Sequence, residues 1–152
     1  MGARVLSVSI IALVLLIGAV SLFSAPIHVW AADSENIQIP SQSVEIQTSP
    51  DPSAGPNMEI WTNATLAVDN VGSVPVTITT IIVQGQSFSY SSTATPGSFT
   101  AASNQIQPGQ SVSFTVLDTS SPTAYNFLSP SPWSLEAVTS NGTTASTAYS
   151  WG

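Results

Sequence analysis

Residues 74–83 read VPVTITTIIV, and this stretch is the strongest strand signal in the chain of 152 residues. Its β-branched side chains are the ones that strands favour. The first apolar members, Val74, Val76 and Ile78, alternate with proline or threonine, as they do when only one face of a strand is buried. Asp-Asn-Val-Gly at 69–72 supplies turn chemistry just before it. The stretch therefore predicts a β domain whose core lies on one side of this strand.

The same succession of a turn and an alternating run returns at 107–118, which reads QPGQSVSFTVLD. Val112, Phe114 and Val116 face one way in that run, so it predicts a second half-buried strand. Residues 58–70 (MEIWTNATLAVDN) predict a further strand. That strand should be interrupted or bulged near Asn63, because its apolar alternation breaks there.

A hairpin is predicted close to the C-terminus. The Asn-Gly pair at 141–142 lies between two Ser/Thr-rich runs, and Asn-Gly is the favoured sequence for a two-residue type I′ turn. With that turn, Leu135 would pair with Ala148 and Val138 with Ala145.

About seven short strands separated by turn signals, without helical periodicity, predict an Ig-like antiparallel β-sandwich at 58–152. Ahead of it, residues 32–57 contain four prolines and predict a stalk or an edge strand, the strand lying at Ser43 to Thr48. A single N-terminal hydrophobic α-helix at 1–31 completes the prediction, and the fold class is mainly β.

The N-terminal segment carries no charge over the 19 residues 5–23. A bilayer core needs roughly 20 apolar residues, whereas the core of a signal peptide has about 7 to 15. The length favours a helix that is retained in a membrane or a filament, although Val-Trp-Ala at 29–31 resembles a signal-peptidase site and keeps a cleaved secretory signal open. Arg4 marks the cytoplasmic end, which sends the rest of the chain outward. The residues expected to pack in an assembly helix are Val5, Ile10, Ile11, Leu13, Val14, Leu15, Leu16, Ile17, Val20, Leu22 and Phe23.

The charges are distributed unevenly. Arg4 is the only Lys or Arg and His28 the only His, so the chain after Trp30 contains no base. A phosphate backbone is bound by basic patches, which excludes nucleic acid as a partner. All eight acids lie in the base-free part, so no salt bridge can form between side chains there. The acids are Asp33, Glu35, Glu45, Asp51, Glu59, Asp69, Asp118 and Glu136.

The same residues limit the chemistry. Without His, Lys or Cys the domain has no conventional activator for a serine nucleophile and no usual zinc ligand. We therefore expect no enzyme activity, no cofactor and no metal, with calcium contact by Asp69, Asn70 or Asp118 as the alternative.

Two sequons match the N-glycosylation pattern, Asn-Ala-Thr at 63–65 and Asn-Gly-Thr at 141–143. Asn63 and Asn141 are therefore candidate glycan sites. Asn141 is the better one because a hairpin tip is exposed, although turn chemistry alone also explains an Asn there.

An apolar helix followed by TLAVDNVGSVPVTITTIIVQG at 65–85 and IQPGQSVSFTV at 106–116 resembles the archaeal type IV pilin and archaellin family. In that family the helices pack in a filament core, and Ig-like β domains, often glycosylated, form the outer sheath. The chain departs from the family at its processing site, because Arg4 is followed by Val5 rather than by Gly or Ala.

The resemblance implies a structural subunit of an extracellular surface filament. Such a subunit is inserted in the membrane before assembly, polymerises with copies of itself through the helix, and exposes its β domain for protection or adhesion. Two alternatives stay open. One is a monomeric surface or binding protein that is tethered or secreted. The other is a thread subunit in which Ser43 to Thr48 is donated to a neighbour after signal cleavage.

Overall fold

A computed structural model describes residues 33–53, 55, 58–118, 124–126 and 132–150. The predicted helix at 1–31, with its assembly residues from Val5 to Phe23, lies outside the described residues. In the part of the chain that is described, no helix is long and apolar enough to span a membrane. The described residues from Asp33 onward belong to one compact unit.

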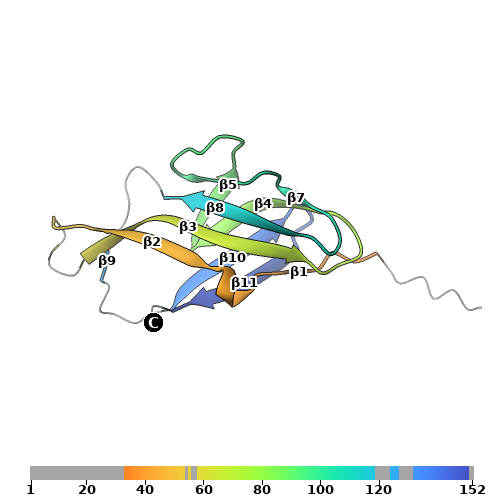
Figure 1. Ribbon diagram of the computed structural model, residues 1–152, viewed down its shortest axis with the longest axis horizontal. Helices are drawn as coiled ribbons and strands as arrows, with labels where there is room; N and C mark the ends of the chain where they lie inside the picture. The colour runs from red at the N-terminus through yellow and green to blue at the C-terminus, as the bar shows by residue number, and fades with distance from the viewer. Residues whose placement is uncertain (1–32, 54, 56–57, 119–123, 127–131, 151–152) are drawn as a thin grey trace, which may run out of the picture. The chain divides into compact units, whose positions relative to one another are not determined.

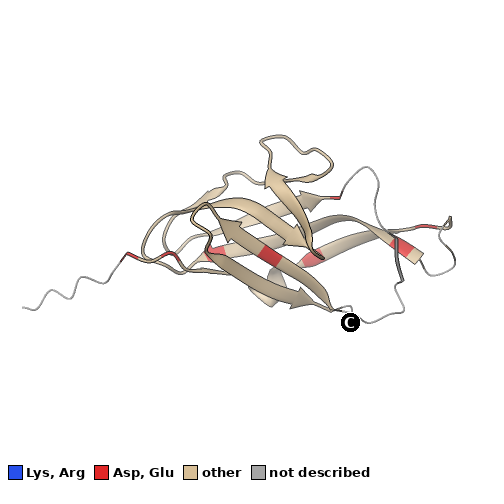
Figure 2. Ribbon diagram, turned by 180° about the vertical axis from the view of Figure 1, so that it is seen from behind, with Lys and Arg blue, Asp and Glu red and all other residues tan. Residues whose placement is uncertain are grey.

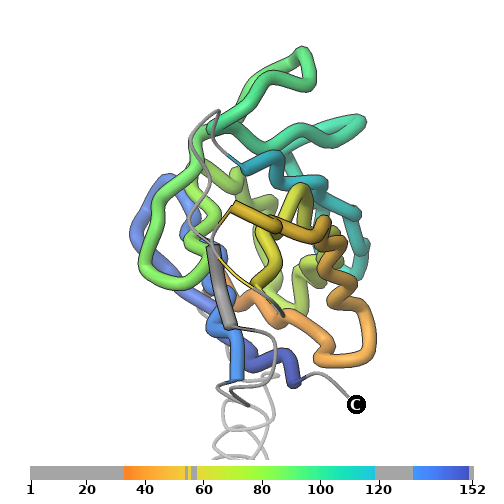
Figure 3. The backbone as a smooth tube through the Cα atoms, turned by 90° about the vertical axis from the view of Figure 1, so that its left-hand side faces the viewer, coloured from red at the N-terminus to blue at the C-terminus, as the bar shows by residue number. Residues whose placement is uncertain are grey.

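The described part is mainly β, as predicted (Figure 1). One hydrogen-bonded sheet runs in the order β1-β3-β8-β6-β5-β4-β10-β11, with β2 and β9 also paired to β3 and β7 to β4. Seen end-on, it wraps around a common core (Figure 3). The elements are β1 (Ile37–Gln38), the 3₁₀ turn η1 (Ser41–Ser43), β2 (Glu45–Pro50), β3 (Met58–Asn70), β4 (Val76–Val83), β5 (Gln86–Tyr90), β6 (Ser98–Thr100), β7 (Gln105–Ile106), β8 (Ser111–Leu117), β9 (Ala124–Asn126), β10 (Trp133–Thr139) and β11 (Thr144–Tyr149).

The antiparallel prediction holds for every described pair except one. β5 and β6 are parallel, with Ser89 opposite Ser98 and Tyr90 opposite Phe99. β6 lies inside 91–104, a stretch that composition makes look like a surface loop. Phe99 is nevertheless fully buried, with its ring 5.6 Å from Phe114 and 5.7 Å from Tyr90. This short strand joins the two halves of the sheet.

A β-bulge in β4 shifts the alternation of buried and exposed side chains within VPVTITTIIV. Thr139 pairs with Ile78 and Val138 with Thr80, which leaves Thr79 as the extra residue. An extra residue shifts the side-chain alternation by one position. Ile78 is therefore buried before the bulge and Ile81 after it, and both parts of the strand face the core.

The bulge predicted near Asn63 in β3 is confirmed one residue earlier. Gln47 pairs with Asn63 while Thr48 pairs with Trp61, so Thr62 is the extra residue. Trp61 is 2 % exposed, and its ring meets those of Phe88 and Trp133 edge-on at 5.5 and 6.1 Å. The expected burial on β8 is also found, since Phe114 and Val116 are buried and Val112 packs against the core.

The predicted register of the last hairpin is wrong by one residue. Leu135 pairs with Thr147, and Val138 with Thr144. A three-residue loop replaces the type I′ turn: Thr139 N–H donates to Thr143 O, Gly142 N–H donates to Thr139 O, and Gly142 alone has positive φ, at 86°. This is a type I turn with a glycine bulge, the usual three-residue hairpin loop.

The type I′ geometry occurs instead at Gln84-Gly85, where φ is 51° and 80° between the paired Val83 and Gln86. Gln84 is the one non-glycine residue with positive φ in the described ranges. Its Oε1 accepts hydrogen bonds from the backbone N–H and the hydroxyl of Ser134, both at 3.2 Å, and its own N–H donates to Ser134 O at 2.9 Å. These bonds to β10 offset the cost of the left-handed conformation.

We expect Gln84→Ala to lower the free energy of unfolding by about 1 to 2 kcal/mol, because the side-chain bonds are lost and the left-handed strain stays. Gln84→Gly removes the same bonds but also the strain, so it should cost about 1 kcal/mol less. Urea unfolding of the two variants measures the difference. Equal losses would show that the side-chain bonds, and not the backbone, decide stability here.

Candidate anchoring site

The segment that leads from the N-terminal region into the sandwich is bound along its length. The N–H groups of Val71 and Gly72 both donate to Asn36 O, at 2.9 and 3.1 Å. Ser73 N–H donates to Ser34 O, and Ser34 N–H donates to Ser73 Oγ, both at 3.0 Å. Ile37 and Ile39, which follow, are buried in the core. We call residues 34–39 the anchoring segment.

Gly72 allows the anchoring segment to lie this close. A Cβ atom at position 72 would be 2.4 Å from Ser34 O and 2.7 Å from Asn36 N. Both atoms belong to backbone, which cannot rotate away as a side chain can. The glycine is therefore required by the close approach of two backbone segments.

Asn70 fixes the turn that holds the anchoring segment. Its side chain is 1 % exposed. Nδ2 donates to Val74 O at 2.8 Å and to Ile106 O at 3.0 Å, while Oδ1 accepts from Gly72 N–H at 3.0 Å. Its backbone N–H donates to Gln110 O, so one residue ties the 70–74 turn to the turn before β8.

Glu35 binds the anchoring segment to the opposite part of the sheet. Its Oε2 accepts from Thr139 Oγ1 at 2.8 Å, and its Oε1 accepts from Asn141 Nδ2 at 2.6 Å. The bond from Thr139 lowers the pKa of the Glu35 carboxyl below its usual 4.5, with smaller contributions from Thr143 and Asn141, while partial desolvation acts the other way. These hydrogen bonds therefore stabilise the charged form of the Glu35 carboxyl.

A pH dependence follows from the lowered pKa of Glu35. The contribution of the ionised Glu35 carboxylate to folding stability is fully present above pH 4.5. It is lost as the pH falls through the lower pKa of the folded state. We expect Glu35→Gln to make thermal stability less dependent on pH in that acidic range. Thermal melts of both proteins from pH 6 down to pH 2 measure this, and Glu136→Gln is the matched control. Identical pH profiles for wild type and Glu35→Gln would contradict the assignment.

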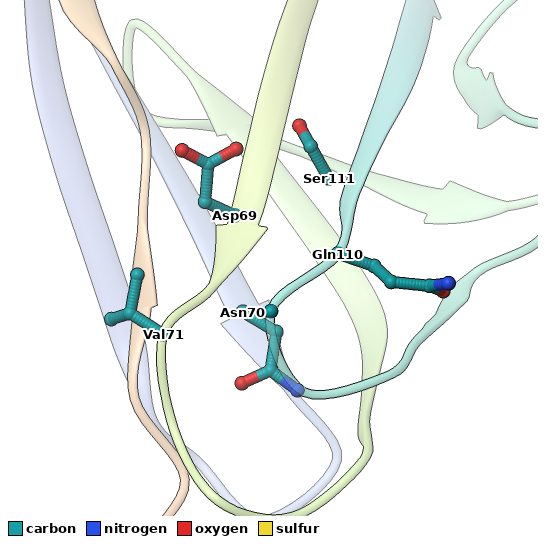
Figure 4. A pocket seen from close by; sticks show the side chains of 6 residues that line it. Asp69, Asn70, Val71, Gln110 and Ser111 are labelled. Carbon is teal, nitrogen blue, oxygen red and sulfur yellow. The ribbon is translucent and has the colours of Figure 1, made fainter.

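A hollow of about 260 Å³ lies beside this site, between the end of β3 and the start of β8 (Figure 4). Asp69, Val71, Gln110 and Ser111 line it, together with Asn70 and Gly109. Val71 is 47 % exposed and is the only large hydrophobic residue so exposed among those described. Asp69 supplies the one carboxylate among these six lining residues. The side-chain amide of Asn70 is already hydrogen-bonded to Val74, Ile106 and Gly72.

The residues named for calcium contact are not brought together. Asp69 pairs with Ser111 at the start of β8, whereas Asp118 follows Leu117 at its other end. Across the described residues, no group of three or more His, Cys, Asp or Glu side chains could hold a metal ion. Figure 2 shows no Lys or Arg in this part of the chain and acidic residues spread singly along it.

The two sequons lie in different surroundings. Asn63 is half-buried within β3, between Gln47 on β2 and Leu117 on β8, and its Nδ2 donates to Gln47 Oε1 at 2.9 Å. Asn141 is exposed at the hairpin tip, and its Nδ2 is bound to Glu35. Glycan attachment to either residue stays a prediction.

Solved structures that resemble this chain include the two that follow, whereas no protein-family model and no curated protein matches it. One is the archaellum periplasmic stator protein complex FlaF and FlaG from Sulfolobus acidocaldarius, with 22 % identity, a TM-score of 0.50, and 83 % of this chain and 98 % of that chain covered. The other is the archaellum periplasmic stator protein FlaG from the same organism, with 22 % identity, a TM-score of 0.48, and 76 % and 100 % covered. The likeness is one of fold.

No sequence signal marks the Glu35 contact, because its partners follow 104 and 106 residues later. Gly72 and Asn70 are visible in sequence only as turn residues. Within 32–57, for which a stalk and an edge strand at Ser43 to Thr48 were both open, β1 (Ile37–Gln38) and β2 (Glu45–Pro50) pair with β3, whereas Ser43 belongs to η1.

Proposed function

We propose that this protein is a structural component of an archaeal surface assembly, comparable to a stator protein. Its N-terminal apolar segment would hold the chain at the membrane, and its β-sandwich would contact other envelope proteins outside the cell. The observation that carries the proposal is the anchoring segment. A domain attached to a membrane through a loose linker needs no close backbone contact at Gly72 and no Glu35 contact, whereas a domain that transmits position or force does.

The comparisons support the same proposal at the level of fold. FlaF and FlaG were solved together as a complex of periplasmic stator proteins, so a sandwich of this kind can serve as a protein-contact module in an envelope. We extend that role to this chain and infer that its partner is a protein. A non-enzymatic role agrees with a domain that has no His, Lys, Arg or Cys after residue 30.

A filament subunit is the second candidate, and the uncharged residues 5–23 favour it. In that role the segment would pack against copies of itself. A donor-strand thread is less well supported, because β2, which includes most of the proposed donor segment, already pairs with β3 of its own chain from Glu45 to Pro50.

Cross-linking in native cells tests the proposal. Amine-reactive reagents cannot modify the domain, since it has no lysine, so a photoreactive residue should replace exposed Val71, with exposed Ser103 as a second position. We expect an adduct with a different envelope protein. Adducts only between copies of this chain, together with filaments in negative-stain images, would instead establish the filament subunit. N-terminal sequencing of the native protein then tells whether residues 5–23 are retained.

A further inference from the structure

We propose that the anchoring segment is a force-bearing clamp, so that tension on the N-terminal side of the domain is resisted by bonds loaded along the strand direction. The inference deepens the proposed structural role and rests on it only for the source of the tension. The clamp itself is a property of the folded chain and can be measured without any partner.

The strands run along the line between the two ends of the domain. β1 is antiparallel to β3, with Ile37 opposite Asn70 and Gln38 opposite Asp69. The chain therefore enters at the end of the sandwich where β3 ends, and the tip of the β10–β11 hairpin lies at this same end, since Glu35 binds Asn141. β11 runs from that tip towards Tyr149 at the opposite end (Figures 1 and 2). Tension between the two ends of the domain thus runs along the strands.

Several hydrogen bonds resist withdrawal of the anchoring segment together. The bonds from Val71, Gly72 and Ser73 to Asn36 and Ser34 lie side by side between the anchoring segment and the 71–73 turn. When an antiparallel pair is pulled along its length, such bonds are loaded together. When the same pair is peeled from one end, they break one after another. The bonds of the anchoring segment are in the lengthwise arrangement, so tension loads them together.

The anchoring segment is bound on two sides. Its backbone is bonded to the turn after β3, while Glu35 is bonded to Thr139 and Asn141 of the β10–β11 hairpin. Ile37 and Ile39 are 4 % and 8 % exposed, so withdrawing the segment also exposes apolar surface to water. Release from one side leaves the contacts of the other side in place.

Single-molecule force measurements on the full chain in lipid nanodiscs test the clamp. The chain has no cysteine, so handles can be attached at introduced cysteines. Asp33→Cys with Ser150→Cys pulls along the strands. Asp33→Cys with Gln107→Cys pulls the segment away from an exposed turn at the same end and serves as the control, because it uses the same fold.

We expect the lengthwise geometry to unfold in one step at a mean force at least about twofold higher than the control geometry, since forced unfolding reports the barrier for the loaded path. Glu35→Gln should lower the lengthwise force and leave the control force unchanged. Release of residues 33–39 at low force before the rest of the domain, in the lengthwise geometry, would overturn the clamp. If the domain resists force as expected but cross-linking finds no envelope partner, only the proposed function is contradicted, and the clamp stands.

Discussion

Replacement of Asn70 by aspartate is expected to lower the free energy of unfolding by about 4 kcal/mol at pH 7. The Asn70 side chain is 1 % exposed and donates to two carbonyl oxygens, Val74 O and Ile106 O. Aspartate has no hydrogen to donate, so both carbonyls lose their bond, and a buried carboxylate is placed against them. No cation in the described domain can compensate this charge.

The loss in Asn70→Asp should shrink in acid. Burial without a cation raises the pKa of a carboxyl in the folded state above its unfolded value. Stability is then regained as the pH falls through that raised pKa, the reverse of the behaviour that Glu35 produces. Urea unfolding at pH 7 and pH 4 measures the effect. Asn104→Asp is the matched control, since Asn104 is half-buried and donates one bond, to Ile78 O, and a loss of about 1 kcal/mol is expected there. Equal losses in the two variants would contradict the role of Asn70.

Gly72→Ala is expected to cost about 2 to 3 kcal/mol, the range for overpacking a closely packed site. The added methyl would lie 2.4 Å from Ser34 O and 2.7 Å from Asn36 N, so the anchoring segment must move away from the 71–73 turn. The bonds of Val71, Gly72 and Ser73 to that segment should weaken with it. Hydrogen exchange at these three amides, together with urea unfolding, measures both consequences.

Gly109→Ala is the control for Gly72→Ala. Its Cβ would meet nothing within 4 Å, but φ is +74°, so about 1 kcal/mol of backbone strain is expected without displacement of the anchoring segment. Amide protection at Val71 and Ser73 should stay as in the wild type. If Gly72→Ala also left that protection unchanged, the close approach would not depend on glycine.

The strands were predictable where apolar and polar residues alternate over several positions. β4 lies within VPVTITTIIV but begins only at Val76, β8 covers SVSFTVLD up to Leu117, and the broken alternation near Asn63 marked a real bulge. β6 was not predictable, because its three residues lie among small polar ones and only Phe99 marks a core position. The register at 139–143 failed because Asn-Gly suits two loop lengths. Gly142 takes the left-handed conformation in the observed one, and Asn141 does not.

The candidate site was much less predictable than the fold. Glu35, Thr139 and Asn141 come together only because the end of β3 and the last hairpin meet at one end of the sandwich. Gly72 reads as an ordinary turn glycine until the backbone of residues 34–36 is placed beside it. Contacts of this kind depend on the tertiary structure, and no local pattern encodes them.

The parallel β5–β6 pair also determines the order in which the domain can fold. β6 bonds to β5 on one side and to β8 on the other, so the two halves of the sheet are joined only after residues 111–117 have been synthesised. Pairings between distant segments slow folding, because long loops must close first. A chain emerging N-terminus first would therefore hold β3 without β8 for a time, with its apolar face open to water. Productive folding during synthesis therefore calls for a chaperone, or for translation fast enough to keep that interval short.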